Sequence, residues 1–121
     1  MSKYHAKKAA CSHGHTHDSK KEARRCDELH VLERKGAIWD LRVQVKIQLL
    51  PPCRFSEIDT RMTDERGLHY IADFQYIQMR DGKPVTVTVD VKGYHAAEYI
   101  IKRKLVKAMY CKDGNCVFIE T

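Results

Sequence analysis

The sequence lacks the features of a membrane-spanning or secreted chain. No apolar run approaches the roughly 18–20 residues that cross a bilayer, and the first eight residues hold no apolar stretch of the kind found in signal peptides. The five cysteines are odd in number and have no CxxC spacing, a pattern typical of free thiols in a reducing compartment. We therefore expect a cytoplasmic protein with no membrane partner.

Several familiar enzyme motifs are also missing. No serine, histidine and aspartate arrangement for nucleophilic catalysis is recognisable, and no glycine-rich loop could cradle a phosphate. The 121 residues suffice for one domain, and 43% hydrophobic with 31% charged residues is the composition of an ordinary folded protein. The 22 lysines and arginines against 16 acidic residues give a net charge of +6, which favours a polyanionic partner such as nucleic acid.

Two segments are expected to lie outside the regular elements. Residues 1–17 are basic and then rich in histidine, so they predict an arm or a short hairpin before a folded domain over 18–121. Residues 53–68 carry charges and a glycine with no sustained period. So long a connection within a compact domain is commonly functional or mobile, and we predict a mobile loop there.

Periodic patterns within 18–121 predict an α/β domain in the order α-β-β-β-α-β. The predicted elements are a helix over 19–35, strands over 40–49, 69–78 and 85–92, a basic helix over 96–109 and a strand over 117–120. The first strand alternates strictly and should place all its apolar residues on one face. We expect a mixed sheet of three or four strands flanked by two helices.

The tight turn at Asp81-Gly82 sets the register of the second and third strands. Counting outward from a two-residue hairpin loop places Asp73 directly opposite Asp90. Opposed residues have Cβ atoms about 4.5–5.5 Å apart, and like charges there are destabilising unless something compensates. A hard cation such as Mg²⁺, which takes carboxylate oxygens and phosphate as ligands, would compensate.

Two more residues complete a four-part candidate site. Lys92 shares a strand face with Asp90, and its ammonium could position or help deprotonate an attacking water. Glu22 belongs to a Ser19-x-x-Glu22 capping box yet falls on the apolar side of the first helix, so it must find a polar partner. The structural alternative is a solvated polar strand face with Glu22 acting only as a cap.

These residues resemble a known superfamily of nucleases. The element order, Glu22 on the first helix, Asp73 on the second strand and Asp90-Val-Lys92-Gly on the third are similar to the PD-(D/E)xK pattern. Five segments more narrowly resemble a phage- and prophage-encoded family of unknown function allied to phage endonuclease I. They are Asp18-Ser-Lys-Lys-Glu22-Ala-Arg-Arg, Leu41 to Gln44, Ala72-Asp-Phe-Gln-Tyr76, Asp90-Val-Lys-Gly-Tyr94 and Lys102-Arg-Lys-Leu105. The resemblance covers roughly residues 3–120, with one departure: Ala72 stands where the proline of the "PD" element is expected.

The resemblance implies a restriction-endonuclease-like core and a Mg²⁺-dependent DNA endonuclease, with Mn²⁺ as a substitute ion, that processes phage or prophage DNA. Asp73, Asp90 and Glu22 would bind the metal, and Lys92 would position the water that attacks in line and leaves a 5′-phosphate. Junction-cutting relatives act as dimers, so branched or nicked DNA and a homodimer are compatible with it. Gln44 lies on the polar face of the first strand, where reaching the site and facing solvent are both open.

The second helix supplies the candidate nucleic-acid contacts. They are four cations, Lys102, Arg103, Lys104 and Lys107. Because they follow the Asp90-Val-Lys92 strand, they could reach phosphates that flank the site. The alternative is the solvated face of an ordinary helix, and RNA stays open as the nucleic acid.

Two further hypotheses come from other classes of protein. One is a nucleic-acid-binding module of the same fold without catalysis. The other is a small zinc-stabilised interaction protein built on Cys11-x-His13-x-His15-x-His17, whose three imidazoles would share one face of a strand. No second regularly spaced cluster completes that site, and Cys111 and Cys116 are interpreted as free thiols around a turn.

Overall fold

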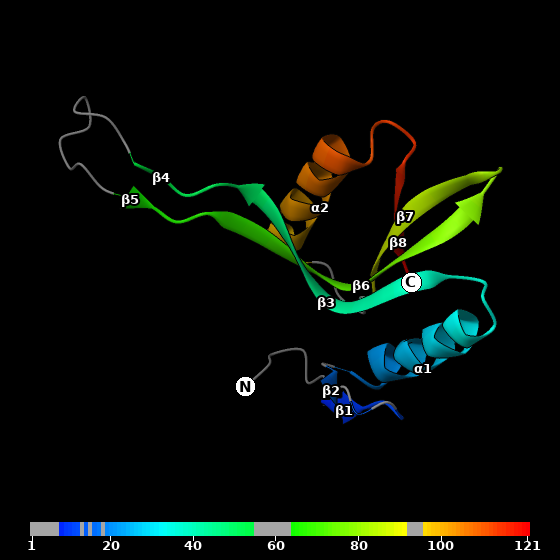
Figure 1. Ribbon diagram of the computed structural model, residues 1–121. Coiled ribbons are helices and arrows are strands. Elements are labelled where there is room, and N and C mark those ends of the chain that lie inside the picture. Colours follow the sequence, from blue (N-terminus) through cyan, green and yellow to red (C-terminus); the bar gives the residue numbers. More distant parts are fainter. Residues whose placement is uncertain (1–7, 13, 15, 18, 55–63, 92–95) are drawn as a thin grey trace.

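A four-stranded mixed sheet with one helix on each face forms the body of the protein (Figure 1). The computed structural model describes residues 8–12, 14, 16–17, 19–54, 64–91 and 96–121. The sheet has the order β3-β6-β7-β8, and its strands are β3 (Trp39–Leu50), β6 (Leu68–Arg80), β7 (Lys83–Asp90) and β8 (Cys116–Glu120). Neighbours pair antiparallel except β7 and β8, which are parallel and joined through α2 (Ala97–Tyr110). With α1 (Lys20–Arg34), these elements confirm the predicted α/β class and α-β-β-β-α-β order.

Short strands lie at both segments that the sequence placed outside the regular elements. Within 1–17, β1 (Ala9–Ala10) and β2 (Thr16–His17) pair antiparallel, so the described part is a hairpin. Within 53–68, β4 (Cys53–Arg54) and β5 (Asp64–Glu65) also pair. The ends of this segment therefore include a small two-stranded sheet, and 55–63, where the rest of the predicted mobile loop falls, lie outside the described residues. Among the described helices, neither has the length and apolar character needed to span a bilayer.

The turn between β6 and β7 adopts the conformation that its sequence predicts. Asp81 and Gly82 both have positive φ, at 50° and 77°, as a type I′ turn requires. The register then runs without interruption from the pair Arg80–Lys83 to the pair Phe74–Val89. The predicted register of these two strands is confirmed over that length.

The first strand departs from the prediction that all its apolar residues share one face. Leu41 and Val43 pack into the core beneath α1, whereas Val45 and Ile47 pack into the core beneath α2. Gln44, between them, has φ 55°, a left-handed conformation that non-glycine residues rarely adopt, and the change of face occurs at this residue. The neighbouring strand, β6, also changes the core that it faces at this level. Phe74 belongs to the α1 core and Ala72 to the α2 core.

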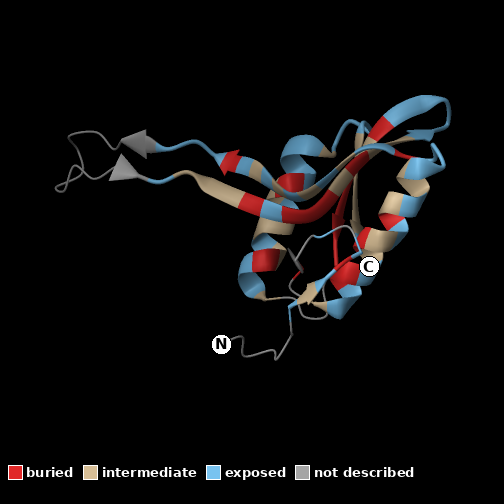
Figure 2. Ribbon diagram, turned by 60° about the horizontal axis from the view of Figure 1, so that its bottom comes forward, coloured by how far each residue is buried: buried red, intermediate tan, exposed pale blue. Residues whose placement is uncertain are grey.

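The two cores thus meet along the middle of the sheet. Figure 2 shows the buried residues concentrated where the sheet passes between the two helices. The α1 core contains Leu29, Phe74 and Val87, and the α2 core contains Tyr70 and Val106. Residues at the boundary have an apolar core on either side, which makes a polar side chain there unusual.

Candidate functional site

A row of four polar residues crosses the sheet at the boundary between the two cores. Gln44 on β3 lies between the register pairs Val43–Phe74 and Val45–Ala72, so it stands opposite Asp73 on β6. Asp73 and Asp90 lie one step beyond the last recorded pair of β6 and β7, and Asp90 pairs in register with Glu120 on β8. Three of the four positions are acidic. The Val91 N–H bond to Asp73 keeps the two strands close at this point, and the direct pairing of Asp73 with Asp90 stays a prediction.

Both aspartates of the row are buried, and each is held by a hydrogen bond. Asp73 is 5% exposed, and its Oδ2 accepts the backbone N–H of Val91 at 2.7 Å. Asp90 is fully buried, and its Oδ2 accepts the hydroxyl of Tyr70. Buried carboxylates are rarely found without compensating partners, because moving their charge out of water is costly. The chain thus keeps two carboxylates oriented in its interior.

Glu22 reaches this row through Gln44. It lies in the first turn of α1, where its backbone N–H donates to the Ser19 side chain at 3.1 Å, which confirms that half of the capping box. Its carboxylate is only 3% exposed, and one oxygen, Oε1, lies 2.7 Å from Gln44 Nε2 and 3.0 Å from His17 Nδ1. Glu22 therefore has the polar partners that its place on the apolar face requires. Lys92, the fourth predicted member, lies outside the described residues.

The far end of the row is joined to α2. Tyr99 donates its hydroxyl to Glu120 Oε2 at 2.6 Å, and Arg103 donates to both oxygens of Glu120 at 3.0 Å. Burial, followed by the hydrogen bond to Glu120, raises the pKa of Tyr99, so this hydroxyl stays protonated at neutral pH. Sequence reasoning did not identify Tyr70, Tyr99 or Glu120, because only the tertiary structure brings these residues to the row.

The four cations of α2 are not equivalent. Lys102 pairs with Glu98 one turn away at 2.9 Å, and Arg103 is held by Glu120. Lys104 and Lys107 are exposed, and the Lys107 ammonium lies 5.7 Å from the centre of the Phe118 ring. Two members of the predicted contact surface are therefore engaged within the chain, and Lys104 and Lys107 are the ones most open to a partner.

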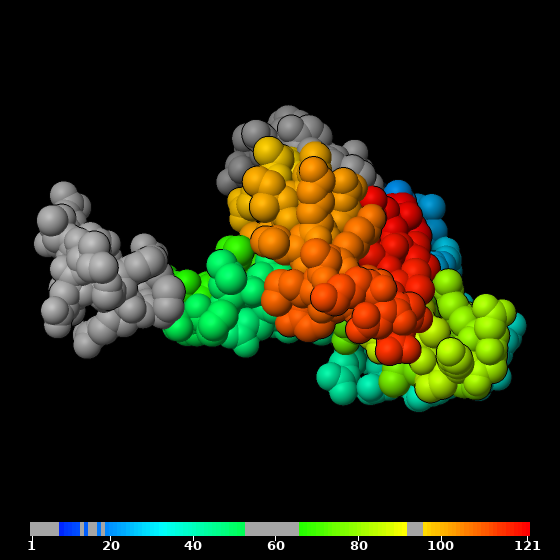
Figure 3. All heavy atoms as spheres, turned by 90° about the horizontal axis from the view of Figure 1, so that it is seen from above, coloured from blue at the N-terminus to red at the C-terminus, as the bar shows by residue number. Residues whose placement is uncertain are grey.

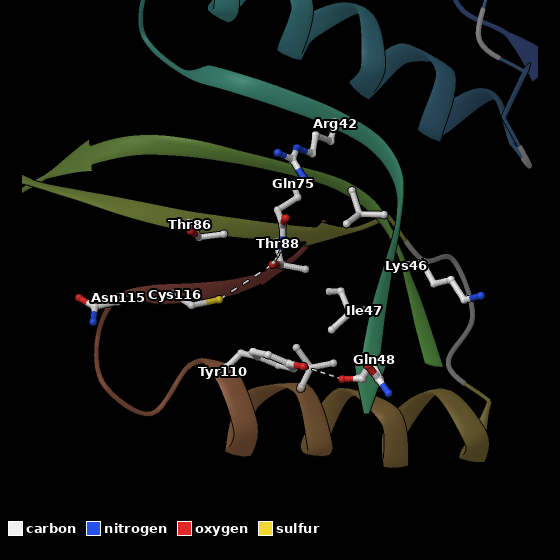
Figure 4. Close-up of a pocket in the computed structure, with 12 residues that line it drawn as sticks. Arg42, Lys46, Ile47, Gln48, Gln75, Thr86, Thr88, Tyr110, Asn115 and Cys116 are labelled. Carbon is white, nitrogen blue, oxygen red and sulfur yellow. Dashed lines mark hydrogen bonds between the residues drawn. The ribbon is translucent and has the colours of Figure 1, made fainter. Parts of the chain in front are cut away.

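A pocket of about 470 Å³ opens beside the row, between the sheet and the end of α2 (Figure 4). Arg42 and Lys46 of β3 contribute positive charge to its lining. Gln75 and Thr88, a directly opposed pair joined by a 3.1 Å hydrogen bond, also line it. Gln75 and Thr88 are two residues along their strands from Asp73 and Asp90, and the described lining of the pocket contains no carboxylate.

A second cluster lies on the α1 side. Cys11, His17 and Cys26 are buried, and one ligand atom from each lies within 4.8 Å of the other two. Burial raises the pKa of Cys26 to about 12. Burial alone would lower the pKa of His17, but hydrogen bonds with Cys11 and Glu22 raise it above its ordinary value. The sequence pointed to Cys11 and His17, whereas Cys26 was missed because it comes from the helix; His13 and His15 lie outside the described residues.

Comparison with known proteins places the chain in a family without assigning an activity. None of the curated proteins matches it, and none of the solved structures does. A family model does match, over residues 1–119, and its description is "Protein of unknown function (DUF1064)". Since the match covers nearly the whole chain, this protein is a member of the DUF1064 family.

Proposed function

We propose that this protein is a metal-dependent nuclease that hydrolyses phosphodiester bonds in DNA. The observation that carries the proposal is the Asp73/Asp90 pair: two buried carboxylates on adjacent strands, each two residues along its strand from a residue that lines a basic pocket. Charges so placed repel each other, and a divalent cation is the partner that would make them mutually favourable. The similarity of Asp90-Val-Lys92 to the PD-(D/E)xK pattern supports the same activity.

The donor set fits Mg²⁺, and Mn²⁺ as its substitute. Both prefer oxygen ligands, and Mg²⁺ is commonly held by one or two carboxylates together with water and substrate phosphate. Asp73 and Asp90 would hold the ion, with Glu22 as a third carboxylate that reaches the row through Gln44. When bound, such an ion supplies Lewis-acid activation of the phosphate and of a water molecule.

The protein's own groups would fix these carboxylates before substrate arrives. The Val91 N–H holds one oxygen of Asp73, and the Tyr70 hydroxyl holds one oxygen of Asp90, so both carboxylates are oriented by the protein itself. Lys92 is the residue whose ammonium would position the attacking water, as the family resemblance implies.

The net charge and the positions of the basic residues favour a nucleic acid as substrate. The chain carries a net charge of +6, Arg42 and Lys46 line the pocket between the sheet and the end of α2, and Lys104 is exposed on α2. Figure 3 shows α2 across the centre of one face of the molecule, with β8 beside it. Cations in these places could contact phosphates on either side of a scissile bond. The odd number of cysteines supports a cytoplasmic site of action.

Cleavage assays with a matched pair of variants test the proposal. Supercoiled, nicked and branched DNA, and RNA as a separate arm, are incubated with Mg²⁺ or Mn²⁺ and with the wild type, Asp90→Asn or Asp81→Asn. Asp81→Asn makes the same chemical change at an exposed turn residue with positive φ, a conformation that asparagine accepts readily. We expect wild type and Asp81→Asn to cut DNA, and Asp90→Asn to be slower by at least about a thousandfold.

Each outcome has a distinct meaning. Equal cleavage by Asp90→Asn would remove the carboxylate pair from the reaction and overturn the proposal. Tight DNA binding without cleavage by any variant would identify the non-catalytic module instead. Cleavage confined to RNA would keep the metal chemistry and change the substrate.

A further inference from the structure

The Cys11, His17 and Cys26 cluster combines ligands from three separate pieces of the chain. Cys11 follows β1, His17 ends β2, and Cys26 lies in the second turn of α1. Their exposed fractions are 7%, 1% and 0%, and their ligand atoms are mutually within 4.8 Å. Zn–S and Zn–N bonds of about 2.3 and 2.0 Å put the corners of a tetrahedral site roughly 3.5–3.8 Å apart. Small side-chain shifts therefore suffice to bring the three atoms to one ion.

Glu22 supplies the support that metal-binding histidines usually have. Its Oε1 lies 3.0 Å from His17 Nδ1, so the carboxylate orients the ring, and a metal ion would be bound through Nε2. A metal-ligating histidine almost always donates its other ring N–H to a carboxylate, a carbonyl or water. The contact between Glu22 and His17 does not depend on how close the two sulfurs lie. It also indicates that a metal ion is the ligand of the cluster.

The cluster also lies in a part of the fold that has little support of its own. The hairpin of β1 and β2 has two residues in each strand, and a hairpin that short is not stable on its own in water. It is tied to α1 by Ser12, whose N–H and hydroxyl both donate to Asp27 Oδ1, at 2.9 and 2.7 Å. A metal ion shared by the hairpin and the helix would fasten the two together, which is how many small domains compensate for limited cores.

A single buried cysteine usually acts as a small apolar residue, and that holds for each thiol taken alone. Two thiols together with an imidazole oriented by a carboxylate are instead the soft sulfur and nitrogen ligands that zinc selects. Half-buried Cys111 and Cys116 offer a comparison, because their sulfurs lie 2.9 Å apart without a histidine in the described cluster.

We propose that Cys11, His17 and Cys26 bind a structural zinc ion that fastens the N-terminal hairpin to α1. Binding forms two Zn–S bonds and one Zn–N bond, and the two thiol protons pass to solvent. One tetrahedral position remains for a further ligand. His30 does not supply it in the described arrangement, because its Nδ1 donates to the Cys26 backbone carbonyl at 2.8 Å. This site is separate from the Asp73/Asp90 pair and would exist with or without nuclease activity.

The experiment measures metal content and sulfur ligation in protein without an affinity tag. Zinc is measured by elemental analysis after purification in a reducing buffer, and Co²⁺ is then titrated into the metal-free protein. Wild type is expected to carry about one zinc per chain and, with Co²⁺, to show thiolate-to-cobalt charge-transfer absorption. Cys26→Ser should lose both signals, and the matched control Cys111→Ser should keep both.

The wild type alone can overturn the proposal, so it does not depend on the folding of a variant. Zinc below about a tenth of an equivalent, combined with Co²⁺ absorption that shows no thiolate band, would refute the site. Zinc retained in full by Cys26→Ser would also refute it. So would intact-mass measurements showing a Cys11–Cys26 disulfide as the stable form in reducing buffer. His17→Gln provides a second ligand variant if Cys26→Ser does not fold.

Discussion

The Asp73/Asp90 pair and the Cys11, His17 and Cys26 cluster present opposite ligand chemistries within one small domain. The pair offers only carboxylate oxygens, which suit Mg²⁺ and Mn²⁺, whereas the cluster offers sulfur and nitrogen, which suit zinc. The pair lies on strands whose register is set by a tight turn. The cluster depends on a hairpin with two-residue strands. The two proposals therefore assign chemistry on phosphates to the first region and support of the fold to the second.

Glu22 is where the two regions meet. The same oxygen, Oε1, contacts His17 of the cluster and Gln44 of the row. A substitution at Glu22 therefore affects both regions, while substitutions further away should affect only one. The variants below separate the two regions, beginning with the largest expected effect.

Asp73→Asn should reduce DNA cleavage by at least about a thousandfold without destabilising the metal-free protein. The amide oxygen can still accept the Val91 N–H, and removing one of two opposed charges relieves repulsion. Cleavage rates and melting temperatures in EDTA are measured on the same preparation. A fall in melting temperature of more than about 5 °C, corresponding to roughly 1 kcal/mol, would contradict the opposed-pair geometry.

Glu22→Gln should lower cleavage about a hundredfold, some 2.7 kcal/mol of barrier, and change stability by no more than roughly 0.5 kcal/mol. A glutamine oxygen can accept from both His17 and Gln44, so the contacts survive and only the charge is lost. Glu28→Gln, on the exposed part of α1 where Glu28 pairs with Arg25, is the control. Full activity in Glu22→Gln would show that Glu22 is a structural residue and confine the carboxylates of the site to Asp73 and Asp90.

Gln44→Gly should lower cleavage about tenfold while leaving stability unchanged or raising it by up to about 1 kcal/mol. Glycine adopts the φ of 55° without strain, which offsets the lost hydrogen bond to Glu22. Gln48→Gly, in the same strand at a residue without positive φ, should instead lose roughly 0.5–1 kcal/mol. Denaturant unfolding of the two variants makes the comparison, and equal losses of stability would argue against strain at Gln44.

Lys104→Ala should weaken DNA binding more than Lys102→Ala and reduce the salt dependence by about one unit for one lost phosphate contact. Lys102 is already paired with Glu98, and that hydrogen bond lowers the pKa of Glu98, so the pair persists at neutral pH. Binding is measured at several salt concentrations with the cleavage-deficient Asp90→Asn background. An identical slope for both variants would mean that this face of α2 does not contact DNA.

Much of the fold follows from local sequence signals. The Ser19 cap, the alternation along β3 and the Asp81-Gly82 turn each act over a few residues, and each predicted its element. The turn also fixed the register of β6 and β7 as far as the pair Phe74–Val89, because a two-residue loop leaves one register. Local rules failed at Gln44, because glutamine is not a residue type that predicts a positive φ. The apolar residues of β3 face one core before Gln44 and the other core after it.

The sites were less accessible to sequence reasoning. Glu22 was recognised as a buried acid, but its partners His17 and Gln44 come from two other strands. Cys26 joined Cys11 and His17 only through the packing of α1 on the hairpin, and no spacing in the sequence encodes that contact. Tyr70 and Tyr99 are aromatic residues of ordinary appearance whose hydroxyls turn toward the acidic row.

Mn²⁺ binding to zinc-saturated protein, followed by electron paramagnetic resonance of the free ion, tests most directly whether the Asp73/Asp90 pair holds a hard cation. It needs no DNA substrate, and zinc already occupies any sulfur and nitrogen site. Wild type and Asp81→Asn should bind Mn²⁺ with equal affinity, and Asp90→Asn should bind at least about tenfold more weakly. Unchanged Mn²⁺ affinity in Asp90→Asn would contradict the assignment of this pair as the metal site.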